Sequence, residues 1–450
     1  MRKIAFLLVA VILFSLLSSC GAELTLMDFV PRDDNYNGFE GYEFVIKGNW
    51  PKNWDPYAKD LENELGESAL SVHEDAIVAH NAKIMEEYDC KITSVYAEWS
   101  WSQNLLLDIV ANTIDYDLMD TNASLMIDNM RGGAVIPWED ANIDLSNAAK
   151  FGEPGYLQSA VHNEKHYGIW PENWQAMHSY RGVMGVNNEL LKSFSNTSVY
   201  ELYENGKWTF DEFKKLLSLF LTDTSLMPLT YYDRKILNVC SILANGSGIV
   251  NYDESTDKYV YGFKDQKAVH AIEYVQSLVN EGLAFEDKDY GYYFDESCVS
   301  PFYLTETWCL GGNLEDMDMI CFPFGPEGEY GVDFSSYRSI NERYFYMPNT
   351  SYPEEVGRFV NVWFEELDEH PKADIVEDFK LNNFYNDESF DMWMKLSEVA
   401  ETDYGYAIFD IYDEFFNEMG TAVFENKSLQ EFIDSYEPLV QAVIDESLNG

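Results

Sequence analysis

The sequence predicts an α/β protein in which helices cover the faces of a sheet. From residue 42 onward, short apolar stretches with the residue types that favour strands alternate with longer stretches whose apolar residues recur at helical spacing. Several of the longer stretches begin with helix start signals. Strands that alternate with helices form a sheet with helices packed on it. In such sheets ligands bind at the carboxyl ends of the strands.

The chain opens with a segment typical of export. Arg2 and Lys3 precede an apolar run over residues 4–17, which is too short to span a bilayer, because a membrane helix needs about 20 residues. A basic start, a short apolar core and small residues at its end predict a secretory signal peptide over residues 1–19.

The signal ends on a cysteine. The motif LLSSC at 16–20 resembles a bacterial lipobox, and this resemblance implies cleavage before Cys20 and a lipid, including palmitate, on its thiol. The simpler alternative is an ordinary cleaved signal with an incidental cysteine. Residues 20–40 have no sustained period and are expected to be a tether that holds the body close to the outer face of the cell membrane.

The first elements after the tether can be placed in order. An aromatic loop, NWPKNWDPY, follows the first strand. The expected ranges are a strand at 42–48, a helix at 74–88, a strand at 91–96, a helix at 102–112 and a strand at 116–120.

Later helices show their starts more clearly. Thr209 and Glu212 form a capping box, with Trp208 and Phe213 placed as a hydrophobic staple. The same box recurs at Ser351 with Glu354 and at Ser428 with Glu431. Trp208, and Trp363 within the apolar face of the second of these helices, are therefore expected to be structural.

Composition limits the partners of the chain. Hydrophobic residues make up 46% of it, enough for large cores. The 29 basic and 79 acidic residues give a net charge of −50, and such a field repels nucleic acid and anionic surfaces. We therefore expect no nucleic-acid partner. The simplest explanation of the charge is a solvated acidic surface, although a cationic ligand is compatible with it.

The cysteines form no recognisable metal or redox motif. Cys90 and Cys240 lie in segments that are expected to be buried. A disulfide bridge among Cys298, Cys309 and Cys321 is one alternative. However, the cysteines after Cys20 are odd in number and include no C-x-x-C pair, which favours mostly buried thiols.

A series of motifs resembles one known family. In order they are YDLM, GGAVIPWED, EKHYGIW, GVMGVNNELLKSF, VYELYENGKWTFDEF, AVHAIEYVQSLVNEGLAF and MICFPFGPEGEYG. Their order and spacing resemble those of family 1 extracellular solute-binding proteins, the lipoprotein receptors of sugar-type ABC importers related to maltose-binding protein. The likeness covers nearly all of the chain after the signal. The chain departs from the family pattern at two points. The segment after residue 366 is long and acidic, and the glycine usual in the family's turn is missing beside Lys165.

The resemblance implies a two-lobed periplasmic-binding-protein type II fold. Strands would cross between the lobes near residues 183–188 and 319–324. The N-lobe would then comprise 41–185 and 322–365, and the C-lobe 186–321 and 366–450. Ligand would touch both lobes only when they close, and so would shift the population to the closed form.

The same resemblance implies the partners. We expect a carbohydrate ligand, the membrane permease subunits of an ABC importer, membrane attachment through the lipid, and a monomer. No cofactor is expected.

Sugar rings have apolar faces that lie on aromatic rings and hydroxyl groups that need polar partners. A sugar site therefore combines tryptophan or tyrosine with amides and carboxylates. Candidates lie on loops near strand ends or match family positions. They are Trp50, Trp54, Asp120, Asn122, Trp170, Trp174, Tyr231, Tyr232 and Trp308. Asn122 has the alternative role of capping the helix that follows.

No motif indicates catalysis. His162 and His166 have the spacing of a zinc-protease helix, but the glutamate between them is one position late. The family resemblance implies a hairpin with its turn at 163–165, and no metal site is expected there. Two alternatives to the sugar receptor stay open. One is a binding protein for a polyamine or basic peptide, and the other is a surface lipoprotein that binds or hydrolyses glycans without transport.

Overall fold

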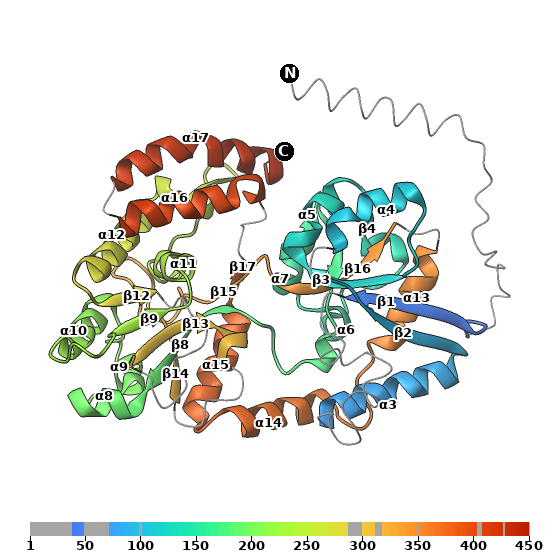
Figure 1. The fold of residues 1–450 in the computed structure, drawn as a ribbon, viewed down its shortest axis with the longest axis horizontal. Coiled ribbons are helices and arrows are strands. Elements are labelled where there is room, and N and C mark those ends of the chain that lie inside the picture. The colour runs from blue at the N-terminus through green and yellow to red at the C-terminus, as the bar shows by residue number, and fades with distance from the viewer. Residues whose placement is uncertain are drawn as a thin grey trace.

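The chain folds into two α/β bodies that lie side by side (Figure 1). The structure is a computed structural model that describes residues 38–48, 72–98, 101–286, 299–310, 317–349, 352–402, 407–425 and 428–449. The expected signal, lipid site and most of the tether lie outside these residues. Among the described residues, no helix is both long and apolar enough to cross a membrane.

The first body, which we call the N-lobe, is built on a six-stranded sheet in which β1 pairs in parallel with β2 and β3. β16 runs antiparallel to β3 and carries the two short strands β4 and β7 at its far edge. The strands are β1 Tyr42–Gly48, β2 Cys90–Tyr96, β3 Leu118–Asn122, β4 Val135–Ile136, β7 Gly168–Ile169 and β16 Arg343–Pro348.

Alternation along the N-lobe strands places apolar side chains on both faces of this sheet. Leu118 and Phe345 belong to one core, whereas their neighbours Met119 and Tyr344 belong to the other, because successive side chains of a strand point to opposite faces. The first core is covered by α3 Val72–Glu87 and α13 Pro353–Trp363, and the second by α4 Leu105–Ala111 and α5 Ala123–Arg131. The sheet is therefore enclosed on both sides, as expected for parallel strands.

The second body, the C-lobe, has a seven-stranded sheet with one continuous core. β9 and β13 are parallel, and β8 runs antiparallel to β13. The strands are β8 Arg181–Asn187, β9 Leu229–Tyr231, β12 Ala284–Glu286, β13 Phe302–Glu306, β14 Met317–Cys321, β15 Tyr337–Arg338 and β17 Glu401–Thr402. Its main helices are α8 Asn188–Phe194, α9 Val199–Glu204, α10 Phe210–Phe220, α11 Arg234–Ala244, α12 Gln266–Asn280, α15 Asp387–Val399, α16 Tyr412–Phe424 and α17 Leu429–Ser447.

Shorter elements complete the fold. In the N-lobe they are η2 Trp101–Asn104, η3 Trp138–Ala141, α6 Ala148–Phe151, α7 Pro154–Leu157, η4 Gln158–Ala160, β5 Val161–His162, β6 Lys165–His166 and η5 Glu172–Trp174. The C-lobe adds β10 Val250–Asp253, β11 Lys258–Tyr261, η6 Gly262–Lys264, η8 Thr307–Leu310 and η10 Phe409–Ile411. α14 Lys372–Asn383 runs along the bottom of Figure 1 from the N-lobe to the C-lobe.

The chain changes sheets at other points than the sequence predicted. All of β8 and β14 pair within the C-lobe sheet, so neither 183–188 nor 319–324 is a crossing. Phe322, Phe324 and Phe334 also belong to the C-lobe core. Three segments join the sheets, and they lie between β7 and β8, between β15 and β16, and between β16 and β17, where the chain runs through α14. We call the first two the first and second linkers, and they contain residues 170–180 and 339–342 respectively.

The helix start signals predicted from the sequence are confirmed in part. Trp208 and Phe213 pack with ring centres 5.3 Å apart, as the predicted staple requires. Ser428 caps α17 by accepting the backbone N–H of Glu431 at 3.2 Å. Thr209 stands at the cap of α10 but its side chain makes no cap bond.

The other predicted features also have definite outcomes. β5 and β6 pair as a hairpin, with Asn163 and Glu164 in the left-handed region that such turns use. Trp363 is fully buried. Cys90, Cys240 and Cys321 are buried free thiols, and Cys309 is a half-buried free thiol. Cys298 and Ser351 lie outside the described residues.

Candidate functional site: a polar cleft between the lobes

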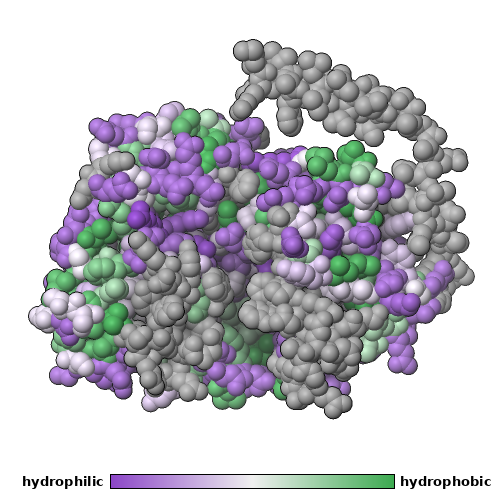
Figure 2. Space-filling view, viewed as in Figure 1, coloured by the Kyte–Doolittle hydropathy of each residue, from purple (hydrophilic) through white to green (hydrophobic). Residues whose placement is uncertain are grey.

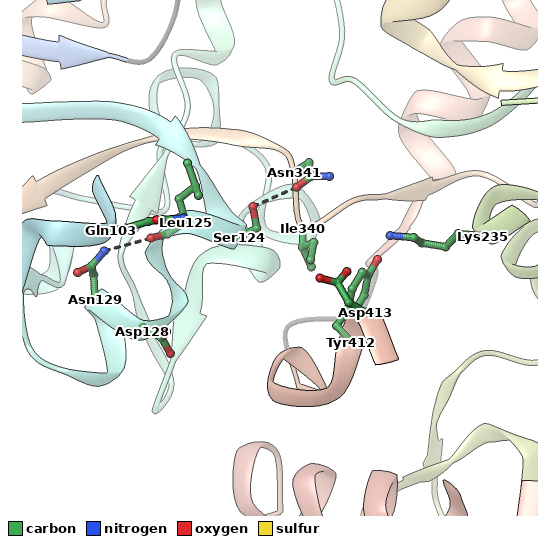
Figure 3. Close-up of a pocket in the computed structure, with 10 residues that line it drawn as sticks. All are labelled: Gln103, Ser124, Leu125, Asp128, Asn129, Lys235, Ile340, Asn341, Tyr412 and Asp413. Carbon is green, nitrogen blue, oxygen red and sulfur yellow. Dashed lines mark hydrogen bonds between the residues drawn. The ribbon is translucent and has the colours of Figure 1, made fainter. Parts of the chain in front are cut away.

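A cavity of about 570 Å³ opens between the two lobes. Its lining comes from both sides of the junction and from the second linker (Figure 3). The lining residues are Gln103, Ser124, Leu125, Asp128, Asn129, Lys235, Ile340, Asn341, Tyr412 and Asp413. The cavity therefore combines amides, hydroxyl groups and carboxylates with an aromatic ring. Figure 2 shows that hydrophilic residues are also widespread on the visible face of both lobes.

The N-lobe side of the cavity is formed by the first turns of α5. Asn129 is fixed because its amide donates to the carbonyls of Ser102 at 2.9 Å and Leu125 at 3.0 Å. The hydroxyl of Ser124 donates to the side-chain oxygen of Asn341 at 3.0 Å. Two amide side chains thus reach the cavity in defined orientations.

The C-lobe side is formed by α11 and the start of α16. The Lys235 ammonium lies 4.3 Å from the ring centre of Tyr412 and 5.2 Å from that of Phe416, which are cation–π distances. Asp413 follows Tyr412 in the first turn of α16. This side presents one cation, one carboxylate and one tyrosine.

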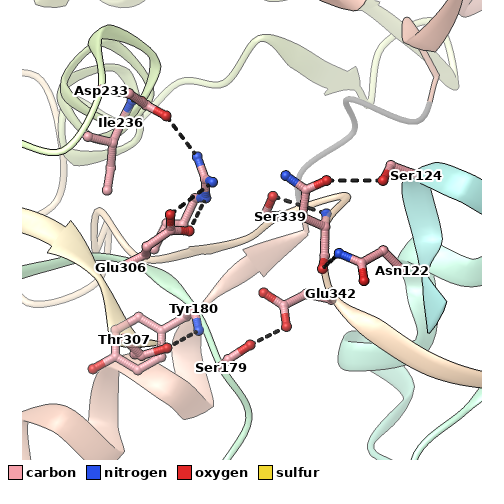
Figure 4. Close-up of polar contacts among 12 residues, drawn as sticks. Asn122, Ser124, Ser179, Tyr180, Asp233, Ile236, Glu306, Thr307, Ser339 and Glu342 are labelled. Atoms are coloured by element: carbon pink, nitrogen blue, oxygen red, sulfur yellow. Dashed lines mark hydrogen bonds and ion pairs between the residues drawn. The ribbon is translucent and has the colours of Figure 1, made fainter. Parts of the chain in front are cut away.

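A buried ionic cluster lies where the carboxyl ends of β9 and β13 face the linkers (Figure 4). The guanidinium of Arg181 contacts Glu306 at 2.7 Å and Asp233 at 3.3 Å. Burial alone lowers the pKa of Arg181, but the charges of Glu306 and Asp233 raise it well above its usual value. Asp233 also caps α11 by accepting the N–H of Ile236 at 2.7 Å. The cluster ties three elements of the C-lobe together.

Gly182 sets the direction of Arg181. The pairing of β8 with β13 shifts at this point, because Thr305 faces Val183 while Glu306 faces Arg181. Gly182 takes the extra position, with φ +94°. Such bulges re-aim the adjacent side chain, which here meets Glu306.

The N-lobe sheet contributes a second ion pair at its edge. Asp120 of β3 pairs with Arg343 of β16. Asn122 donates to the carbonyl of Asn341 at 2.5 Å, and its side chain makes no cap bond to α5. The first two backbone N–H groups of α5, on Ala123 and Ser124, instead donate to carbonyls of the second linker. The capping alternative for the Asn122 side chain is therefore wrong.

The predicted aromatic residues have different fates. Trp174 is fully buried, and its indole N–H donates to the carbonyl of Glu365 at 2.7 Å. It packs against Trp363 in the N-lobe core, so its prediction as a cleft residue is wrong. Trp170 is half-buried against Tyr156, with ring centres 5.5 Å apart.

The tyrosines of the C-lobe are closer to the site. Tyr231 is buried in β9 and packs on Phe424. Tyr232 is half-buried, with its ring centre 5.9 Å from the Arg181 guanidinium. Neither tyrosine lines the cavity, and neither do Asp120 and Asn122. Trp50, Trp54 and the side chain of Trp308 lie outside what the structure describes.

Sequence reasoning missed every residue that lines the cavity. For Gln103, Ser124 and Asn129 a signal was present, because Gln103 follows the end of β2 and the other two follow the end of β3, and ligand sites form at such strand ends. For Lys235, Tyr412 and Asp413 the sequence gives no signal, since only tertiary packing brings α11 and α16 to the cleft. Within the described residues, no group of three metal-binding side chains comes together.

Comparison with solved structures gives the class of fold. The cyclic α-maltosyl-1,6-maltose binding protein of Arthrobacter globiformis superposes with a TM-score of 0.65 at 13% identity, over 90% of this chain and 100% of that one. The galacto-N-biose/lacto-N-biose I-binding protein of the ABC transporter from Bifidobacterium longum gives 0.60 at 13%, over 91% and 98%. An extracellular solute-binding protein of family 1 from Alicyclobacillus acidocaldarius gives 0.53 at 13%, over 89% and 98%.

These likenesses establish the fold. The chain has the two-lobed α/β architecture of solute-binding proteins, as the sequence predicted. No family model matches the chain, and no curated protein sequence matches it.

Proposed function

We propose that this protein is an exported, lipid-anchored receptor that binds a carbohydrate between its lobes and delivers it to an ABC importer. The cavity that both lobes line is the observation that carries the proposal. A ligand that contacts both walls stabilises the arrangement in which the walls are close, and so drives hinge closure. Binding, and not catalysis, is the proposed activity.

The lining chemistry supports a polyhydroxylated ligand. Asn129 offers its side-chain oxygen as an acceptor, because its N–H groups bond the carbonyls of Ser102 and Leu125, and Asn341 offers its side-chain N–H groups as donors. Asp128 and Asp413 offer further acceptors on opposite walls. Tyr412 adds the aromatic ring on which the apolar face of a sugar packs. Two of the three similar structures named above are those of proteins that bind a cyclic maltosyl-maltose and galacto-N-biose or lacto-N-biose I, which favours this ligand class.

The proposed location follows from the first residues of the chain. The basic and apolar start and the LLSSC motif support export and a lipid at Cys20. A tethered receptor stays near the membrane permease to which it would hand its ligand.

The test is a titration of intrinsic tryptophan fluorescence with neutral oligosaccharides and, separately, with polyamines. A saturable change with an oligosaccharide and no product after long incubation is the expected result. Gln103→Ala removes an amide from the N-lobe wall, and Asp413→Asn replaces a charged acceptor oxygen by an NH2 group on the C-lobe wall. Each should weaken binding about tenfold, which corresponds to about 1.4 kcal/mol. Gln430→Ala and Asp434→Asn, on the exposed surface of α17, are matched controls that should bind normally.

Three outcomes would contradict the proposal. Binding of polyamines alone, abolished by salt, would indicate a cationic ligand. Release of reducing sugar would indicate a glycan hydrolase. No fluorescence change with either the oligosaccharides or the polyamines would indicate a role outside transport.

A further inference from the structure

The second linker is attached to the N-lobe. The carbonyls of Ile340 and Glu342 accept the backbone N–H groups of Ser124 and Ala123 at 2.7 and 2.8 Å. Together with the contacts of Asn341 to α5 and β3, these bonds make Glu342 move with the N-lobe.

The end of the first linker is attached to the C-lobe. The carbonyl of His178 accepts the hydroxyl of Ser397 at 3.0 Å, and the carbonyl of Tyr180 accepts the N–H of Thr307 at 3.0 Å. The ring of His178 also stacks on Tyr156 of the N-lobe, with ring centres 4.0 Å apart. Tyr180, whose hydroxyl donates to the carbonyl of Trp393 at 3.1 Å, is therefore the residue that makes Ser179 move with the C-lobe.

One hydrogen bond joins the two linkers at this point. The hydroxyl of Ser179 donates to the carboxyl group of Glu342 (Figure 4). Because each partner is anchored to a different lobe, this contact spans the hinge. A rotation of one lobe against the other that separates the two linkers would break it.

The Glu342 side chain has an unusual setting for a carboxyl group. It is buried, and among the described residues no lysine or arginine lies within ion-pair distance of it. The Tyr156 hydroxyl, at 3.5 Å, is its other hydrogen-bond donor. The remaining titratable and charged groups that surround it are Arg338 of β15, Arg181 of β8, Glu306 of β13, Tyr344 and Arg343 of β16, and His178 with Glu172 of the first linker.

We propose that Glu342 is a positioning residue whose protonation couples closure of the lobes, and thereby ligand binding in the cleft, to pH. For its ligand, the proposal rests on the function proposed above. Ile340 and Asn341 line the cavity directly before Glu342 in the chain, so a shift of this carboxyl group reaches the ligand site through the backbone.

Burial raises the pKa of Glu342 to about 7, although the hydrogen bond from Ser179 lowers it. Below that pH the neutral acid stays between Ser179 and Tyr156 without a desolvation cost. Above it the carboxylate is charged and buried with no cation within ion-pair distance, a state that proteins avoid, although the more distant charges of Arg181 and Arg338 lower its pKa. Water can then hydrate the carboxylate only if the linkers separate. The arrangement described here is therefore favoured on the acid side. Since both lobes line the cavity in this arrangement, it is also the one that the proposed ligand would stabilise.

The ligand-free test is small-angle scattering of the purified protein from about pH 5.5 to about pH 8.5. The radius of gyration should change with a midpoint near the pKa of Glu342, and Glu342→Gln should abolish the change. Ser179→Ala should move the midpoint upward, because it removes a bond that stabilises the carboxylate. Glu189→Gln, which removes the same charge from an exposed site on α8, should behave like the parent protein. The same pH dependence in Glu342→Gln as in the parent would overturn the proposal.

The ligand-bound test uses the oligosaccharide with the strongest response in the fluorescence titration. Its affinity should fall about fivefold or more between pH 6 and pH 8 in the parent and stay constant in Glu342→Gln. Equal losses in both proteins would overturn the link to binding. If no oligosaccharide binds at any pH, the proposed function fails, while the scattering experiment still decides whether Glu342 controls the hinge.

Discussion

At the scale of single residues, the position of Arg181 depends on a neighbour that has no side chain. Gly182 combines a φ of +94° with a close approach, since an added Cβ would lie 2.6 Å from the carbonyl oxygen of Ser335. Gly206 has a similar φ of +67° but open space around it. A comparison of substitutions at the two glycines therefore separates the cost of an unfavourable φ from the cost of a steric clash.

This contrast gives a stability prediction. Gly206→Ala should lower the free energy of unfolding by about 1 kcal/mol through the unfavourable φ alone. Gly182→Ala should cost about 3 kcal/mol or more, because Ser335 and Cys240 must also move. Chemical denaturation of the two variants checks this. Equal losses would mean that the bulge adapts and that the tight contact does not matter.

Individual residues were also where prediction from sequence was weakest. From the sequence Trp174 was expected in a loop, and loops usually lie on the surface. Trp174 instead ends η5, and its ring packs against Trp363 in a way that no local pattern predicts. Glu342 carries no sequence signal either. Its burial results from two linkers that are far apart in the chain.

At the scale of elements, local patterns predicted well. The strand at 42–48 has the predicted ends, and the helix predicted at 74–88 spans Val72–Glu87. The strand predicted at 116–120 is Leu118–Asn122, so its end was placed two residues early. Period and capping are properties of neighbouring residues, whereas the choice of lobe is not. For that reason the elements were right and the crossings were misplaced.

Two helix starts allow a matched test of capping. Ser428 bonds the N–H of Glu431 at the start of α17, whereas the Thr209 side chain makes no such bond at α10. Ser428→Ala should lower the free energy of unfolding by about 1 kcal/mol, and Thr209→Ala by clearly less. Urea titrations of both variants measure this, and a larger loss for Thr209→Ala would contradict it.

At the scale of the whole molecule, the large negative net charge is expected to lower the stability of the folded chain. With 79 acidic and 29 basic residues, the folded chain repels itself, and salt screens such repulsion. The thermal midpoint at neutral pH should therefore rise as sodium chloride is added. The rise should be much smaller near about pH 4, where the carboxylates are partly protonated. A midpoint that falls with salt at neutral pH would show that ion pairs outweigh repulsion.

The hold of α5 on the second linker has a mechanical consequence. β15 ends at Arg338, which is bound to the C-lobe through the carbonyl of Ser397 at 3.0 Å, and the N-lobe already holds the carbonyl of Ile340. Ser339 alone lies between these two attachments. Through the second linker, lobe motion is thus limited to rotation about the backbone torsions of one or two residues. An extra glycine after Ser339 would lengthen the free segment between the two attachments. The two walls of the cavity would then lose their alignment without any change to the residues that form them.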